Sequence, residues 1–266
     1  ATTIPTDEGT ADSDWAGNIF AAVKGSGSGG YEFFGEGLEL GRSAFLGEDE
    51  LFTARAPDSL RSPPRYYWRA RIYDHYADGQ WSDTFSVYQD FFPDQPPLNL
   101  PDLEERETAE IDFAISQERL YTLYSPAQPV WVSRPAEILL ARTLDDEIDL
   151  VAFHAAPYLE AGETYQTRVA LLNPTILRLR QAGEDYPIWV LQRYLQLPSG
   201  LTPRVRELAQ RLTDGQDNPF DKAVAVTAFL RREIRYALTV PAPPLGRDTL
   251  DWFLFDWKEG FCNYYA

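Results

Sequence analysis

The chain has 266 residues, and 44% of them are hydrophobic and 14% aromatic, which is enough for a real core in one large or two medium domains. Its formal net charge of −17 argues against nucleic-acid binding, which needs clustered lysine and arginine, and against docking of a basic patch on anionic lipid. The sequence contains no run of about 18 apolar residues, so no segment of it is expected to span a membrane.

The N-terminal stretch is polar and then rich in glycine. Residues 1–14 are expected to form a mobile lead-in, and Ile19–Val23 a short strand. The run from Gly25 to Gly30 is interpreted either as a long hairpin loop or as a linker. The chain starts at Ala1, contains no methionine and shows no signal-peptide pattern, so we expect it to be a fragment of a longer protein.

Residues 31–170 carry mostly strand patterns. In the run 66–76, Trp68 and Ile72 fall on one face and Arg69 and Arg71 on the other, as in a strand with one buried face. Asp78-Gly79 then predicts a tight hairpin, with Trp81 starting the return strand. The proline-rich and acidic run 91–105 predicts a surface loop. Further strands are expected at 50–56, 111–115, 120–124, 130–133, 137–141, 150–153 and 164–172. Such short, closely spaced strands indicate a β-sandwich or open barrel.

The pattern becomes helical after Asn173-Pro174, and we interpret residues 173–200 as a helical connector. Thr202 suits an N-cap and Pro203 a first helical position, and Gly215 ends that helix. Asn218 caps a second helix whose apolar side is wide, so we expect it to be well buried. The predicted fold is therefore α+β, with a β-rich domain over 1–172, the connector over 173–200 and a helical domain over 201–266.

The single cysteine, Cys262, lies four residues from the end of the chain, where a turn at Gly260-Phe261 precedes the start of a helix. A thiol at a helix N-terminus is close to unpaired backbone N–H groups, which favour the thiolate and suit a nucleophile. The alternative is a small buried hydrophobic residue, which is the usual state of a lone cysteine. One cysteine excludes an internal disulfide.

The remaining residues with metal-binding or acid–base side chains give no clear site. His75 and His154 lie in the β-rich half, far in sequence from Cys262, and with one cysteine at such spacing they do not form a zinc motif. The acidic run 145–149 lacks the glycine and the spacing of an EF-hand loop. We therefore expect no metal and no cofactor.

The C-terminal third resembles the transglutaminase-like superfamily, and most closely its bacterial TgpA-type membrane-anchored branch. The resemblance runs from about Leu201 to Ala266 and depends on four motifs in the order of the family: Asn218-Pro219-Phe220-Asp221-Lys222-Ala223, Ile234-Arg235-Tyr236, Asp251-Trp252-Phe253-Leu254-Phe255 and Glu259-Gly260-Phe261-Cys262-Asn263-Tyr264-Tyr265-Ala266. A weaker similarity lies upstream at Tyr67–Asp74 and Asp78–Trp81.

The resemblance implies a papain-like Cys-His-Asp triad in which Cys262 is the nucleophile, with the histidine and aspartate beyond Ala266. It implies thioester-forming acyl transfer from a glutamine side chain of a protein or peptide substrate, in an extracytoplasmic domain of a membrane-anchored bacterial protein. Trp252 and Trp257 are candidates for substrate binding, although aromatic residues before the nucleophile more often pack its helix. Without its partners in the triad, the isolated chain is expected to have no transamidase activity.

Two other functions remain open from the sequence. The same scaffold supports a cysteine protease or amidase acting on a peptide or cell-wall substrate, because fold and triad do not separate the two reactions. A non-enzymatic binding or assembly module is the third possibility.

Overall fold

The computed structural model describes residues 20–25, 37–40, 49–57, 67–84, 86–101, 106–143 and 147–266, and for 20–25 and 37–39 the backbone only. The chain divides into two compact units. One comprises residues 1–33, 46–72 and 85–173, and the other 34–45, 73–84 and 174–266. The predicted lead-in at 1–14 and most of the glycine-rich run lie outside the described residues.

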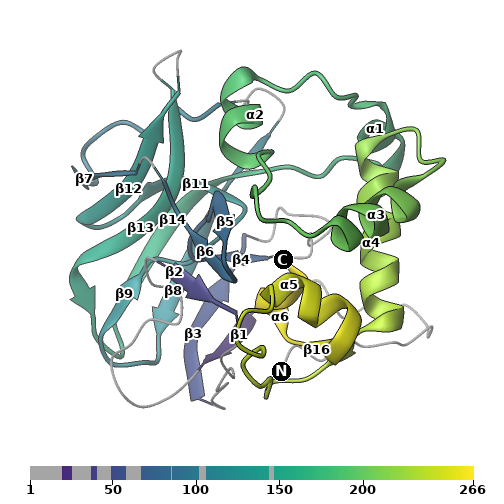
Figure 1. Ribbon diagram of the computed structural model, residues 1–266. Coiled ribbons are helices and arrows are strands. Elements are labelled where there is room, and N and C mark those ends of the chain that lie inside the picture. The colour runs from purple at the N-terminus through teal and green to yellow at the C-terminus, as the bar shows by residue number, and fades with distance from the viewer. Residues whose placement is uncertain are drawn as a thin grey trace, which may run out of the picture. The chain divides into compact units, whose positions relative to one another are not determined.

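The first unit contains two antiparallel sheets, shown in Figure 1. One has the strand order β1-β3-β8-β14-β11 and the other the order β7-β12-β13-β9, while a short pair joins β10 to β4. The strands are β1 (Phe20–Gly25), β3 (Asp49–Arg55), β4 (Trp68–Arg69), β7 (Val87–Phe91), β8 (Glu107–Ile115), β9 (Leu120–Thr122), β10 (Ser125–Pro126), β11 (Gln128–Val132), β12 (Ala136–Arg142), β13 (Ile148–Leu159) and β14 (Thr164–Leu171). The predicted β-rich N-terminal part is therefore confirmed.

Alternating burial explains why these segments are strands. In β8, Ile111, Phe113 and Ile115 are buried and the residues between them are exposed, which is the period of two expected for a sheet with one covered face. Phe113 stacks on Tyr165 with ring centroids 4.6 Å apart. Phe52 packs at 5.3 Å from Phe113, so aromatic rings dominate this core.

Three segments of the chain differ from what the sequence predicted. The strand predicted over 66–76 is broken, because only Trp68–Arg69 pairs with β10 and the chain leaves the first unit after Ile72. The run 91–105 was predicted to be a surface loop, yet Leu98 and Leu100 are buried within it. The edge strand β7 was not predicted, because most of its side chains are exposed and give no apolar pattern.

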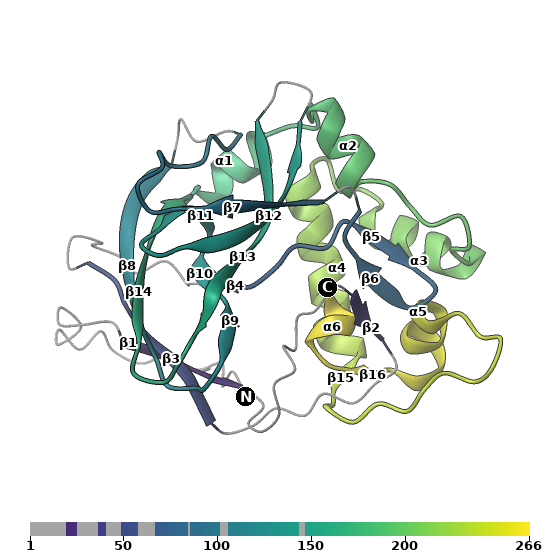
Figure 2. The ribbon, with the colours of Figure 1, turned by 90° about the vertical axis from the view of Figure 1, so that its left-hand side faces the viewer.

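The second unit is mainly helical (Figure 2). It contains α1 (Ile176–Gln181), α2 (Ile188–Tyr194), α3 (Pro203–Thr213), α4 (Pro219–Glu233), β15 (Arg235–Tyr236), α5 (Thr249–Trp252), the π-helical turn η1 (Phe253–Trp257), β16 (Glu259–Gly260) and α6 (Cys262–Tyr265). Asn218 caps α4 as predicted, since its side chain accepts from the N–H of Asp221 at 2.9 Å. No described helix in either unit is long and apolar enough to cross a membrane.

The same unit includes a small antiparallel sheet in the order β2-β6-β5, formed by β2 (Gly37–Glu39), β5 (His75–Ala77) and β6 (Gln80–Ser82). The predicted hairpin at Asp78-Gly79 joins β5 to β6, and both turn residues have positive φ. The hairpin thus groups with residues 174–266 and not with the sheets that flank it in sequence.

Helix α4 does not have the burial predicted for it. None of its residues is buried, and Val224 on its apolar side is 48% exposed. The width of an apolar stripe shows which face of a helix is suited to packing, but it does not supply the element that covers that face. The prediction that this helix is well buried is therefore wrong for the described chain.

Candidate active site around Cys262

Cys262 is the first residue of α6, a helix of four residues. Phe261 precedes it in an extended conformation, and β16 leads into it from a parallel pairing with β15. Gly260 is required at this point by close packing, because a Cβ there would lie 2.7 Å from Cε2 of Phe253 and 2.9 Å from Cβ of Tyr264. The glycine two residues before the cysteine therefore allows α6 to lie directly against the preceding aromatic segment.

The thiol is exposed, and its electrostatic environment is less favourable than the sequence suggested. Desolvation by the surrounding protein raises the pKa of Cys262, and the backbone N–H groups of Asn263 and of Cys262 itself lower it by a smaller amount. The Sγ atom lies 3.4 Å from Oδ1 of Asn263, an acceptor that favours the protonated thiol. The backbone N–H groups thus act in the expected direction, but desolvation outweighs them in this chain.

Tyr236 lies beside the cysteine because of the strand pairing. It is opposite Gly260 in the β15–β16 register, and the N–H of Ala237 donates to the carbonyl of Gly260 at 2.8 Å. Burial is the main cause that raises the pKa of Tyr236, the charge of Cys262 raises it further, and the backbone N–H of Cys262 lowers it by a smaller amount. The Tyr236 phenol is therefore close to the thiol and to the backbone N–H of Cys262. Sequence reasoning assigned Tyr236 no role at the cysteine.

The aromatic residues before Cys262 divide into buried and exposed members. Trp252 and Trp257 stack with ring centroids 5.5 Å apart and an interplanar angle of 14°. Trp252 is 7% exposed and Trp257 is 39% exposed. Phe253 is fully buried and packs on Tyr264 of α6 at 5.0 Å. Phe253 and Trp252 thus support the segment that carries the cysteine, and Trp257 keeps an open face.

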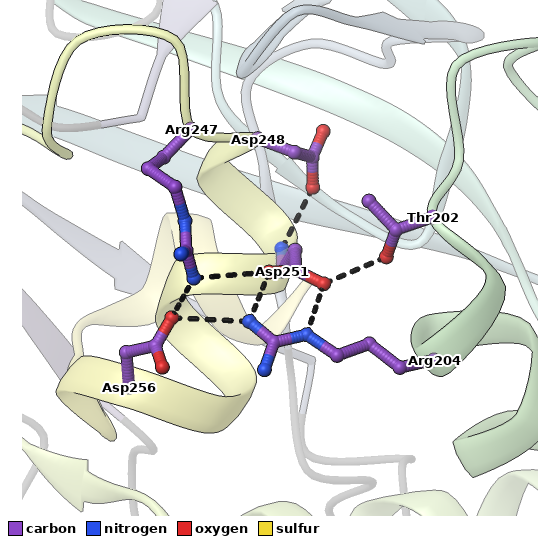
Figure 3. A network of polar contacts seen from close by, with 6 residues as sticks. All are labelled: Thr202, Arg204, Arg247, Asp248, Asp251 and Asp256. Atoms are coloured by element: carbon purple, nitrogen blue, oxygen red, sulfur yellow. Dashed lines mark hydrogen bonds and ion pairs between the residues drawn. The ribbon is translucent and has the colours of Figure 1, made fainter.

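Asp251 is the centre of a polar network that links α5 to α3 (Figure 3). Its carboxylate accepts two hydrogen bonds from the guanidinium of Arg204 and one from the hydroxyl of Thr202 at 2.7 Å. The Asp251 N–H donates to the N-cap Asp248 at 2.7 Å. Thr202 is the N-cap residue of α3 as predicted, but its hydroxyl bonds to Asp251 and not to its own helix. Sequence reasoning found no role for Asp251, because its partners lie 47 and 49 residues away.

The same network includes a second acidic residue, Asp256. It pairs with Arg204 at 3.0 Å and also with Arg247. The guanidinium of Arg204 lies 4.4 Å from the ring centroid of Phe255. Hydrogen bonding from Arg204 is the main cause that lowers the pKa of Asp251. The segment before the cysteine is thus fixed to α3 by charge as well as by packing.

The two histidines lie on strands in different units. His75 lies on β5, opposite Ser82 of β6, in the unit that contains Cys262. His154 lies on β13, opposite Glu137 of β12, in the other unit. Among the described residues, no group of three or more histidine, cysteine, aspartate or glutamate side chains could hold a metal ion. Asp145 and Asp146 of the acidic run lie outside those residues.

These features define a transglutaminase-like unit: two helices, a short strand, an aromatic segment and a cysteine at a helix start, in a chain that also contains a β-rich unit. A model of the transglutaminase-like superfamily matches residues 206–266. The model of the TgpA N-terminal domain matches residues 10–176, more than half of the chain, and the chain therefore belongs to the TgpA family of transglutaminase-like proteins.

Two curated relatives are similar in sequence. The protein-glutamine gamma-glutamyltransferase of Pseudomonas aeruginosa is 26% identical over 233 residues, 87% of this chain and 30% of the relative. The uncharacterized protein YebA of Bacillus subtilis is 38% identical over 92 residues, 34% of this chain and 12% of the relative. The chain thus spans less than a third of the length of either relative.

Two solved structures share the fold. One is the periplasmic domain of TgpA from Pseudomonas aeruginosa, with a TM-score of 0.52, 20% identity and coverage of 88% of this chain and 73% of that chain. The other is the same domain bound to ethylmercury, with a TM-score of 0.50, 23% identity and coverage of 88% of this chain and 75% of that chain. The predicted α+β architecture, with a β-rich part before a helical part, is confirmed by this likeness.

Proposed function

We propose that the protein carrying this chain is an extracytoplasmic, membrane-anchored acyltransferase that uses Cys262 as its nucleophile on glutamine side chains. The thiolate attacks the carbon of the γ-carboxamide, the C–N bond breaks, and ammonia leaves after it takes up a proton. The resulting thioester is attacked by a lysine amine, or by water, and the thiolate is released. No metal or cofactor takes part in these steps.

The observation that carries this proposal is the placement of one exposed thiol at the start of α6, within the segment that matches the transglutaminase-like superfamily. A buried structural cysteine, the alternative left open by the sequence, does not fit the exposure of Cys262. The transferase activity in the name of the Pseudomonas aeruginosa relative supports the choice of reaction, and the periplasmic origin of the similar structures supports the location.

The raised pKa of Cys262 indicates that the thiol needs a general base. The family pattern supplies a histidine, oriented by an aspartate, on the C-terminal side of the cysteine, and we propose that the same holds in the full-length protein. The 266-residue chain by itself is then inactive as a transamidase.

The test is incorporation of a fluorescent primary amine into a glutamine-containing protein such as casein, by the full-length protein and by its Cys262→Ser variant. We expect the wild type to incorporate amine and the variant to lose essentially all of the signal. Retained amine incorporation by the Cys262→Ser variant would overturn the proposal. Cleavage of casein by the wild type without any amine incorporation would replace acyl transfer by the protease reaction.

A further inference from the structure

The hairpin of residues 73–84 is the part of the unit around Cys262 that comes from far upstream in the chain. It lies inside the range matched by the TgpA N-terminal domain, whereas the transglutaminase-like match starts at residue 206. By its contacts, however, it belongs to the unit of residues 174–266. The boundary between the two family matches is therefore not the boundary of the compact unit that carries the cysteine.

The base of the hairpin is held by Asp74, whose side chain is almost fully buried. Its carboxylate accepts from the N–H of Thr84 at 2.8 Å and from the Thr84 hydroxyl at 3.0 Å, which closes the hairpin. The same carboxylate pairs with Nε of Arg193 on α2 at 2.8 Å. The side-chain amide of Gln196 also donates to the Asp74 carbonyl at 2.7 Å. A buried, paired carboxylate at this point fixes the direction of the hairpin relative to α2.

The turn of the hairpin packs closely against the start of α5. Gly79 has a φ of +80°, and a Cβ there would lie 2.5 Å from Oγ1 and 3.0 Å from Cβ of Thr249. Thr249 is the first residue of α5 and is buried. The backbone of Gly79 therefore fills the space above Thr249, and no larger residue fits without moving one of the two.

A second residue of the hairpin, Tyr76, lies near α6. Tyr76 packs on Trp81 with ring centroids 5.1 Å apart, and its hydroxyl is buried. Burial is the main cause that raises the pKa of Tyr76, and Asp248 and Tyr264 raise it further. Asp248 caps α5 and Tyr264 follows Cys262 by two residues, so Tyr76 is near the segments on both sides of the cysteine.

These contacts continue to the thiol through close packing. Phe253, directly after α5, is fully buried and touches both Gly260 and Tyr264. A displacement of α5 must therefore move Phe253 or open a gap beneath α6. We propose that the 73–84 hairpin is a positioning element for Cys262, which sets the thiol and its backbone N–H groups in their reactive place through Gly79 and Thr249. This inference rests on the proposed role of Cys262 as the nucleophile.

The experiment compares Gly79→Ala with Gly215→Ala in the full-length protein. Both glycines have a positive φ, +80° and +75°, but nothing lies within 4 Å of a Cβ at Gly215. The two variants therefore share the backbone strain and differ in the contact with Thr249. We expect Gly79→Ala to lower kcat for amine incorporation at least about tenfold with little change in KM, since a displacement of about 1 Å can cost about 100-fold. Gly215→Ala should leave kcat within about twofold.

A second variant, at Thr249, tests the proposal even if the Gly79→Ala protein does not fold. Thr249→Ala removes the contacts with Gly79 from the other side and retains a good helix former, and it is also expected to lower kcat. The rate at which iodoacetamide alkylates Cys262 should differ from wild type in both variants. Thermal unfolding shows whether each variant is folded. If folded Thr249→Ala and Gly79→Ala proteins keep wild-type kcat and alkylation rates, the hairpin has no positioning role. That result does not affect the assignment of Cys262 as the nucleophile. Only retained activity of the Cys262→Ser protein would overturn that assignment.

Discussion

Arg204 at the start of α3 and Asp251 in α5 form a bidentate ion pair, in which Nε and Nη2 of the arginine donate to separate oxygens of the carboxylate. Asp251 is 5% exposed, whereas the Arg204 side chain is 41% exposed. The carboxylate also accepts from Thr202. The pair therefore joins the aromatic segment before Cys262 to the first long helix of the unit.

The Asp251→Asn variant is expected to lower the free energy of unfolding by about 1–3 kcal/mol, the value of charge-assisted hydrogen bonds to a mostly buried group. Thermal or urea unfolding of the 266-residue chain measures this change. Asp256→Asn is the matched control, because Asp256 contacts Arg204 from an exposed position and should have a smaller effect. Equal losses in the two variants would contradict the central role of Asp251.

The same pair predicts a dependence of stability on acid pH. Hydrogen bonds from Arg204 lower the pKa of Asp251 below its unfolded value, so its stabilisation is complete above the unfolded pKa of about 3.9 and is lost as pH falls through the folded pKa. Urea unfolding at a series of pH values below about 4 should show a steeper loss in the wild type than in Asp251→Asn. Parallel curves for the two proteins would show that other carboxylates cause the acid unfolding.

The thiol of Cys262 should react slowly at neutral pH in this chain. Desolvation raises its pKa above the ordinary thiol value of about 8.5, so the thiolate is scarce at pH 7 and increases only as pH rises through the raised pKa. Iodoacetamide alkylation measured against pH should show its inflection above that value. In the full-length protein we expect the inflection at lower pH because of the proposed base. An inflection well below 8.5 in the 266-residue chain would contradict the raised pKa.

Tyr236→Phe should increase the reactivity of Cys262. The backbone N–H of Cys262 lowers the pKa of both the Tyr236 phenol and the Cys262 thiol, so removal of the phenol leaves that donor to the thiolate alone. We expect alkylation at pH 8 to become about threefold faster, the effect of one weak hydrogen bond of about 0.5–1 kcal/mol.

Tyr265→Phe is the control for this change, because its hydroxyl donates to the carbonyl of Ile234 at 2.9 Å. It should leave the alkylation rate unchanged. Slower alkylation of Tyr236→Phe would instead mean that the phenol donates to the thiolate.

Trp257 and Trp252 are proposed to differ in function although their rings stack. Trp252→Ala should cost about 3–5 kcal/mol of stability, because it empties a buried site. Trp257→Ala should change stability little and raise KM for the glutamine substrate with kcat unchanged, since its exposed face is available to a substrate. Steady-state kinetics of the full-length protein test this, and an unchanged KM would remove Trp257 from the substrate site.

Much of the local structure could be read from the sequence, because it depends on residues close together in the chain. Alternating apolar residues specified β8, and the Asn218-Pro219 start specified α4. The order of motifs around Cys262 identified the transglutaminase-like unit, and the Gly260-x-Cys262 spacing indicated the start of α6. In each case a short-range pattern of dihedral preference, capping or periodicity was sufficient.

Tertiary structure decided the features that depend on distant partners. Only the folded chain pairs Asp251 with Arg204, brings Tyr236 to the backbone of Cys262 and puts Gly79 on Thr249. It also shows α4 without a buried residue, because periodicity reveals an apolar face but not what covers it. The pKa of Cys262 also depends on tertiary structure. The helix start that lowers this pKa can be predicted from the sequence, whereas the desolvation that raises it more strongly comes from residues brought together by folding.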